Sequence, residues 1–181
     1  MNPRLHGFTL VELMVALAIL AILLAIAAPS YRDFVVDSRM RGEANEFLTG
    51  LNFTRSEAVK RNATVSICSK GSGDGCANSG SWKLGWIVFV DLDGDGKVES
   101  GDTILRVHGA LNEQSNLAGT LTGTTTVATD VTFLPDGRSR LSGGVGTEGT
   151  FNLCADGAPA SGRQVNLALG RANAKKFTCS T

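Results

Sequence analysis

The feature that most constrains this chain is an uninterrupted apolar segment near its amino terminus. From Phe8 to Ala28 the sequence reads FTLVELMVALAILAILLAIAA, in which only Thr9 and Glu12 are polar. As a helix, this segment would be about 30 Å long, which matches the hydrocarbon thickness of a bilayer. A secretory signal peptide usually has a shorter apolar region, of about 7–15 residues, that ends at a small-residue cleavage site. The segment therefore predicts a membrane-spanning helix.

Glu12 is the unusual residue of this segment. A carboxylate within a spanning helix costs about 3 kcal/mol unless it is paired or reaches the interface, so Glu12 is a candidate functional residue. Cleavage of the chain after Gly7 would place a new α-amino group on Phe8, one helical turn from Glu12. That ammonium group, in the same chain or in a neighbour, would neutralise the carboxylate. The alternative is that Glu12 only extends to the lipid headgroups.

The run Gly7-Phe8-Thr9-Leu10-Val11-Glu12-Leu13 resembles the prepilin signature of type IV pilins and type II secretion pseudopilins. The resemblance implies that a prepilin peptidase cleaves after Gly7, that Phe8 is then N-methylated, and that Glu12 is needed for assembly. Residues 1–7 would form the leader and residues 8–28 the transmembrane and assembly helix. Pro29 stands where many pilins have a proline that weakens the helix.

Beyond Pro29 the helical pattern resumes with polar residues mixed in. Apolar residues recur at helical spacing and predict one buried stripe, formed by Ala44, Phe47, Leu48, Leu51 and Ala58. Charged residues mark the side that we expect to face solvent, namely Arg41, Glu43, Glu46, Arg55, Lys60 and Arg61. Residues 29–61 therefore predict an amphipathic helix that packs under a sheet. A helix from Phe8 to Arg61 would be about 80 Å long.

Residues 62–181 have the pattern of a β-rich globular head. Of the 22 glycines, only three lie in the first sixty residues, and the rest mark a turn-rich region. Six β-branched or aromatic runs predict strands: Thr64–Cys68, Leu84–Asp91, Thr103–Val107, Val131–Leu134, Thr150–Cys154 and Gln164–Leu169. The threonine-rich segment 118–129 fits either a strand or a loop. The expected fold class is α+β, with a long N-terminal helix packed on an antiparallel β-rich head.

Two further segments narrow the resemblance. Trp82-Lys83-Leu84-Gly85-Trp86-Ile87-Val88-Phe89-Val90-Asp91 and Gly101-Asp102-Thr103-Ile104-Leu105-Arg106 are similar to the GspH/FimT family of minor pilins and pseudopilins. The resemblance implies a pilin-like fold and a minor pilin that helps to initiate or cap a type IV pilus, in support of twitching motility and adhesion. It implies other major and minor pilins, prepilin peptidase and an inner-membrane assembly platform as partners. The chain would cross the inner membrane once, with its head in the periplasm, before it joins a pilus on the cell surface.

Two alternative functions remain open at this stage. One is a DNA-binding minor pilin for natural transformation, and the other is a pseudopilin of a type II secretion system. Enzyme activity is not expected, because His108 is the only histidine beyond the leader and no Ser-His-Asp or Cys-His arrangement can be drawn. No catalytic residue is therefore assigned.

Four cysteines lie in the head. Cys68, Cys76, Cys154 and Cys179 form an even set, as expected for two disulfides in an oxidising compartment. Four cysteines permit three pairings. We favour Cys68 with Cys76, which closes a glycine-rich loop, and Cys154 with Cys179, which ties down the carboxyl terminus. Zinc is disfavoured because there is no CxxC pair and one histidine.

An acidic segment matches the spacing of a calcium-binding EF-hand loop. Its oxygen ligands would come from Asp91, Asp93, Asp95, the Lys97 carbonyl, Glu99 and Asp102, with Gly96 at the sharp turn. Against calcium, the last position is Asp rather than the longer Glu, and the flanks read as strands. The alternative is a hairpin turn built by Asp and Gly, with no cofactor.

The last nineteen residues contain four cations and no acid: Arg163, Arg171, Lys175 and Lys176. The formal net charge of the chain is zero, and leader removal would leave −1, so any anionic partner must be held by such a local patch. Some FimT-like pilins are DNA receptors with a carboxyl-terminal Gly-Arg-x-Arg motif. Here Gly170-Arg171-Ala172-Asn173 keeps the first arginine and has Asn173 in place of the second. Two interpretations of this tail remain: it binds DNA, or it is only a solvent-exposed charged surface.

Overall fold

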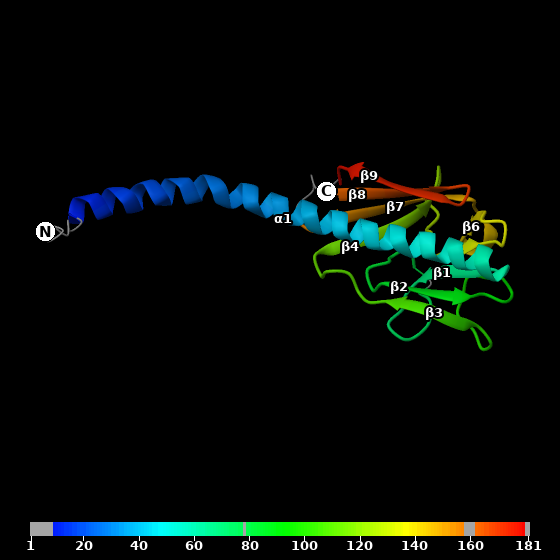
Figure 1. Cartoon of the computed structure of the whole chain (residues 1–181). Helices are drawn as coiled ribbons and strands as arrows, with labels where there is room; N and C mark the ends of the chain where they lie inside the picture. Colours follow the sequence, from blue (N-terminus) through cyan, green and yellow to red (C-terminus); the bar gives the residue numbers. More distant parts are fainter. Residues whose placement is uncertain (1–8, 78, 158–161, 180–181) are drawn as a thin grey trace, which may run out of the picture. The chain divides into compact units, whose positions relative to one another are not determined.

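The computed structural model describes residues 9–77, 79–157 and 162–179. Over these ranges the chain forms one long helix followed by antiparallel strands (Figure 1). The elements are α1 (Leu10–Arg61), β1 (Val65–Ser69), β2 (Trp86–Val90), β3 (Thr103–His108), β4 (Ser115–Leu121), β5 (Asp130–Phe133), β6 (Ser139–Leu141), the short 3-10 helix η1 (Ser142–Gly144), β7 (Glu148–Ala155), β8 (Gly162–Ala168) and β9 (Arg171–Phe177). The order of helix and strands confirms the predicted α+β class.

Helix α1 belongs to two compact units. The first unit ends at Val35 and the second, which we call the head, runs from Val36 onward. The helix begins where the Thr9 hydroxyl accepts a hydrogen bond from the backbone N–H of Glu12, as an N-cap residue does. It ends at Asn62, whose φ of 51° is left-handed and cannot continue the helix. Its backbone remains helical through Pro29.

The strands form two antiparallel sheets. The first has the order β3-β2-β1-β5-β6 and the second has the order β4-β7-β8-β9. Both lie beside the second half of α1 (Figure 1). Strands β4 and β9 are the edges of the second sheet, and β3 is an edge of the first.

One core joins the helix to both sheets. Phe47 of α1 is fully buried, and its ring lies 5.2 Å from each of Trp82 and Trp86 and 4.9 Å from Phe151, measured between ring centroids. Four of the five predicted stripe residues are buried, Leu48 is half-buried, and Met40 also joins the core. The predicted packing of an amphipathic helix under a sheet is therefore confirmed.

The opposite face of the first sheet holds a second, smaller cluster. Cys68, Ile87 and Phe89 are buried there, with Cys76 and Val98 packed against them. Cys76 and Val98 lie in the two connections that follow β1 and β2. The glycine-rich and acidic connections thus cover the face of the sheet that α1 does not contact.

The structure corrects the predicted solvent side of the helix at Glu43. We expected Glu43 to face water, but it is only 9% exposed, and its Oε1 accepts a hydrogen bond from the backbone N–H of Asn112. Arg55 is also drawn inward, where its Nε donates to the Gly137 carbonyl. Charge type alone could not reveal this, because a long polar side chain can be buried when a loop supplies its hydrogen-bond partner.

Strand prediction succeeded where the apolar alternation was strong. The six predicted strands correspond to β1, β2, β3, β5, β7 and β8, with shifts of one to a few residues at their ends. The undecided segment 118–129 contains the second half of β4 and then a turn, so it is partly strand. Strands β6 and β9 were not assigned, because β6 has three residues and β9 is mostly polar.

Candidate functional site

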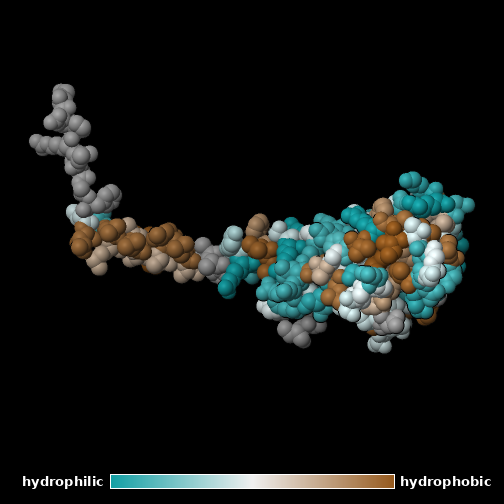
Figure 2. Space-filling view, turned by 90° about the horizontal axis from the view of Figure 1, so that it is seen from below, coloured by the Kyte–Doolittle hydropathy of each residue, from teal (hydrophilic) through white to brown (hydrophobic). Residues whose placement is uncertain are grey.

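Between Leu10 and Ile26 the first unit is an apolar helix with exposed side chains. Leu10 is 74% exposed, Leu17 is 56% exposed and Ile26 is 70% exposed, and the surface of this segment is apolar almost throughout (Figure 2). By length and composition, α1 can cross a membrane. Glu12 lies in its first turn and is exposed. The predicted cleavage and methylation residues, Gly7 and Phe8, lie outside the described residues.

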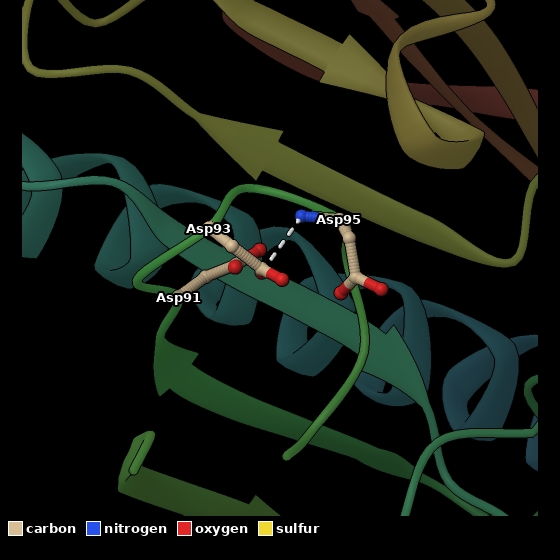
Figure 3. Close-up of side chains that lie close together, drawn as sticks. All are labelled: Asp91, Asp93 and Asp95. Atoms are coloured by element: carbon tan, nitrogen blue, oxygen red, sulfur yellow. Dashed lines mark hydrogen bonds between the residues drawn. The ribbon is translucent and has the colours of Figure 1, made fainter. Parts of the chain in front are cut away.

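The acidic loop follows β2 and brings three carboxylates together. Asp91, Asp93 and Asp95 each place an oxygen within 4.8 Å of the others (Figure 3). The backbone N–H of Asp95 donates to the Asp93 carboxylate over 3.3 Å. The three side chains therefore form the acidic cluster that the sequence spacing predicted.

Asp91 anchors this loop from its buried end. It is 1% exposed, and its carboxylate accepts hydrogen bonds from the Ser66 hydroxyl (2.6 Å) and from the backbone N–H groups of Gly94 (2.7 Å) and Gly96 (3.0 Å). Burial raises the pKa of Asp91 above its ordinary value, and the three hydrogen bonds oppose this rise without cancelling it. Gly96 has a φ of 79°, and a side chain there would meet the Asp130 carboxylate. The loop is thus stabilised by its own hydrogen bonds to Asp91 and by the left-handed backbone of Gly96.

The six predicted calcium ligands are not all assembled. Glu99 and Asp102 are not part of the three-carboxylate cluster. Asp102 instead accepts hydrogen bonds from the backbone N–H groups of Leu92 and Glu99. The Lys97 ammonium lies 2.9 Å from the Asp95 carboxylate, and this hydrogen bond lowers the pKa of Asp95. The hydrogen bonds of the loop fit a hairpin turn, which is the alternative to calcium binding by the three aspartates.

The predicted basic residues separate into two groups. Arg171, Lys175 and Lys176 are exposed on β9, an edge strand. Because side chains alternate along a strand, Arg171 and Lys175 share one face, and Lys176 lies on the other face beside Arg163 of β8. A groove of about 390 Å³ is lined by Lys175, Lys176, Arg163 of β8 and Arg41 of α1. Arg41 is a cation that the sequence did not place with the tail, because only the fold brings α1 beside β9.

Arg163 is a correction to the predicted basic site. It is 8% exposed, and its guanidinium lies 2.7 Å from the Asp37 carboxylate of α1. Burial raises the pKa of Asp37, but the hydrogen bond from Arg41 and the charge of Arg163 outweigh it and hold this pKa below its ordinary value. Arg163 therefore ties β8 to the helix and does not present a free charge to a phosphate.

Two disulfides are present, with the pairing that we favoured. Cys68–Cys76 closes the connection after β1, with 5.6 Å between the two Cα atoms. Cys154–Cys179 joins β7 to the segment after β9, with 5.9 Å between the Cα atoms. The first holds the glycine-rich connection over the second apolar cluster, and the second secures the end of the chain.

A family comparison agrees with this architecture. The model of the family described as Type II transport protein GspH matches residues 43–172, which include most of the head. The chain belongs to the GspH family. A second model, the prokaryotic N-terminal methylation motif, matches residues 3–28 of this GspH-family chain. The family is one of pilin-like proteins.

Curated relatives match this GspH-family chain over short stretches. It is 59% identical over 34 residues to fimbrial protein EcpC of Eikenella corrodens, covering 19% of this chain and 22% of that protein. It is 46% identical over 50 residues to the type IV major alpha-pilin of Moraxella bovis, covering 28% of this chain and 31% of that protein. The chain thus spans less than a third of the length of either relative.

A solved structure has the same fold. The type IV minor pilin FimU of Pseudomonas aeruginosa matches with a TM-score of 0.59 and 22% sequence identity, covering 81% of this chain and 99% of that chain. At this identity the likeness establishes the pilin-like fold. The fold prediction made from the sequence is confirmed.

Proposed function

We propose that this protein is a minor pilin that joins a type IV pilus and helps to initiate or cap its assembly, in support of twitching motility and adhesion. The observation that carries the proposal is the exposed apolar helix of the first unit, with Glu12 in its first turn. An apolar surface of this kind requires lipid or other apolar helices around it. The subunit is anchored in the inner membrane with its head in the periplasm, and it then packs among the helices of other major and minor pilins.

Glu12 has a specific role in this proposal. Removal of the leader by prepilin peptidase would leave an ammonium group on Phe8, which is then N-methylated. Pairing of Glu12 with such a group on a neighbouring subunit offsets the cost of a carboxylate in an apolar medium. The pairing selects the axial position of each new subunit at the inner-membrane assembly platform. No catalytic step is required, and the proposed role is not enzymatic.

Replacement of Glu12 by Gln tests this function. The variant keeps the size and helix propensity of the side chain and removes its charge. We expect Glu12→Gln to remain in the membrane fraction and to fall at least about tenfold in sheared filaments, which corresponds to a loss of about 1.4 kcal/mol. Glu113→Gln, at an exposed carboxylate of the head, is the matched control. Equal incorporation of Glu12→Gln and the parent protein would refute the proposal.

A pseudopilin of a type II secretion system is the second candidate. The name of the matching family, Type II transport protein GspH, favours it. The physical role of the helix is the same in both machines, so deletion phenotypes separate them. If a deletion strain loses its filaments and still secretes protein normally, the minor pilin is supported. If it keeps its filaments and loses protein secretion, the pseudopilin is supported.

DNA uptake is the third candidate, supported by the exposed cations of β9 and by Arg41 in the neighbouring groove. Binding through phosphates weakens steeply with salt. If the surface binds DNA, Arg171→Ala and Lys175→Ala each lower retention of DNA by the full chain in detergent and reduce its dependence on salt. Lys60→Ala is the control. If neither β9 variant changes the retention of DNA, the DNA-uptake function is refuted.

A further inference from the structure

Strand β3 is an open edge of the first sheet (Figure 1). It pairs with β2 along Thr103–His108, and among the described residues no other segment makes a backbone bridge or backbone hydrogen bond to it. In an antiparallel ladder, an edge strand directs alternate N–H and C=O groups away from its one partner. The six residues of β3 span about 20 Å, which is long enough for a further strand to pair with them.

The other edges of the two sheets are protected in ways that natural proteins commonly use. Strand β6 has only three residues. Strand β4 is covered on its outer side by backbone bridges at Ala118 and Thr120. Strand β9 carries an arginine and two lysines. Strand β3 contains neither lysine nor proline, and Arg106 is its one residue with a permanent charge.

A β-bulge in β3 places two apolar side chains on the same face of the sheet. Phe89 of β2 lies opposite Ile104. Ile87, two residues earlier on β2, lies opposite Val107, three residues later on β3, so β3 has one extra residue between them. Ile104 and Val107 therefore both lie on the face of the second apolar cluster, where they remain 46% and 51% exposed. In Figure 2, which views the head from the side on which β3 lies in Figure 1, part of the surface is apolar.

The opposite face of β3 leaves space beside α1. A pocket of about 260 Å³ is lined there by Trp86 of β2, by two residues of β3 and by four of α1, namely Arg106, His108, Asn45, Glu46, Thr49 and Gly50. The guanidinium of Arg106 lies over the Phe53 ring, 5.9 Å from its centroid. Arg106 therefore places its charge on the α1 side and does not shield the apolar face. A strand beside β3 would meet two apolar side chains on one face and room for a side chain on the other.

We propose that β3 receives an extended segment from the head of a neighbouring pilin subunit, which adds one strand to the first sheet. A further strand satisfies the outward N–H and C=O groups of β3 and covers its apolar pair, whereas water satisfies only the polar groups. The minor pilin FimU shares the strand-rich fold of this head, so pilin heads can offer such a segment. This inference rests on the proposed function, because the partner is another subunit of the same filament.

Photo-crosslinking in assembled filaments tests the contact. A benzophenone side chain is placed at Ile104 of the full chain in one form and at Val107 in another, because both side chains are exposed on the open face. We expect both probes to crosslink to one short segment of another pilin subunit. Strand addition places the two crosslinked positions within a few residues of each other in that segment. Crosslinks confined to the same chain, or to a protein that is not a pilin subunit, overturn the proposal.

A lysine on the edge strand provides a second test of the same contact. Val107→Lys, in the chain with the probe at Ile104, introduces the kind of charge that protects natural edge strands. The yield of crosslinks should fall at least about fivefold, because an apolar cross-strand contact is lost and a charge must be desolvated. Val145→Lys is the matched control, since Val145 is 74% exposed and lies outside β3. The melting temperature of each variant identifies any loss that comes from unfolding, and a yield that Val107→Lys leaves unchanged overturns the proposal.

Incorporation into filaments separates this contact from the proposed function. If the chain that carries the probe enters filaments without crosslinks to another subunit, the strand contact fails and the proposed function stands. If Glu12→Gln incorporates as the parent does, the proposed function fails. A chain that never enters filaments overturns both.

Discussion

The two halves of α1 share one backbone conformation and differ in what surrounds their side chains. In the first half, Leu10 and Ile26 are 74% and 70% exposed, whereas Phe47 and Leu51 of the second half are fully buried. Between Leu10 and Ile26 the helix is apolar apart from Glu12, and the second half has one apolar stripe that the two sheets cover. Helix formation therefore says little about burial, which depends on how apolar residues are distributed around the axis. The first half needs partners from outside its own chain, and the second half supplies the head with its core.

The largest expected loss of stability comes from a change in the buried half of the helix. Phe47→Ala removes a ring that contacts two tryptophans and Phe151, so we expect the head to lose about 3–5 kcal/mol of unfolding free energy. Denaturant unfolding followed by tryptophan fluorescence measures this loss. Recovery in the membrane fraction should not change, because the first half is untouched. A loss of membrane recovery for folded Phe47→Ala would break the comparison between the halves.

A charge in the middle of the apolar half should impair membrane insertion and leave the stability of the head unchanged. Ile19→Arg costs about 2.5–3.5 kcal/mol of membrane insertion and leaves the unfolding free energy of the head unchanged. Extraction of membranes at alkaline pH, followed by quantification of the retained subunit, measures the first quantity. Ile19→Leu is the conservative control. Normal retention of Ile19→Arg would show that the first half does not depend on lipid.

Loss of the ion pair at the start of the head should lower the unfolding free energy by a smaller, pH-dependent amount. Asp37→Asn leaves Arg163 buried without its counter-charge and should cost about 1–3 kcal/mol at neutral pH. The pKa of Asp37 is held below its ordinary value of 3.8, so its contribution is present above that value and is lost as the pH falls through the lower, folded-state pKa. The difference between parent and variant should therefore shrink in acid. Unfolding curves from about pH 3 to pH 7 measure it, and a difference that grows in acid would contradict the assignment.

The smallest expected effect concerns the acidic loop. Asp93→Asn keeps the acceptor for the backbone N–H of Asp95, so the unfolding free energy should change by less than about 0.5 kcal/mol without calcium. Addition of calcium should not raise the melting temperature of the parent, because Asp95 is paired with Lys97 and Asp102 with backbone N–H groups. A calcium-dependent rise that Asp93→Asn removes would establish the metal site in the head.

The sequence predicted best those features that depend on local pattern. The apolar run, the amphipathic stripe around Phe47 and the six strongest strands are read from period and composition, and each appears in the structure. It predicted less well the elements that tertiary contacts decide. Strand β9 has the polar sequence RANAKKF and is a strand because it pairs with β8 along its full length. Propensity cannot anticipate a pairing partner.

The same dependence on tertiary contacts explains which candidate sites could be predicted from the sequence. The acidic cluster was predictable because its three aspartates are two residues apart in one loop. The fate of Arg163 was not predictable, because its partner Asp37 lies 126 residues away in the chain. The pocket around Trp86 was missed for the same reason, since it joins side chains of α1 to those of β2 and β3.

By itself, the sequence determined that this chain has an apolar helix with an acid near its start, a helical stripe that needs a sheet, and a head with two disulfides. Those properties follow from the period and chemistry of neighbouring residues, which act over a few bonds or turns. Only the tertiary structure decided which charges are buried in pairs, which cations remain exposed on β9, and that side chains of α1, β2 and β3 line one pocket. These outcomes depend on burial and on distances between remote segments, and both are set only when the helix and the two sheets pack around one core.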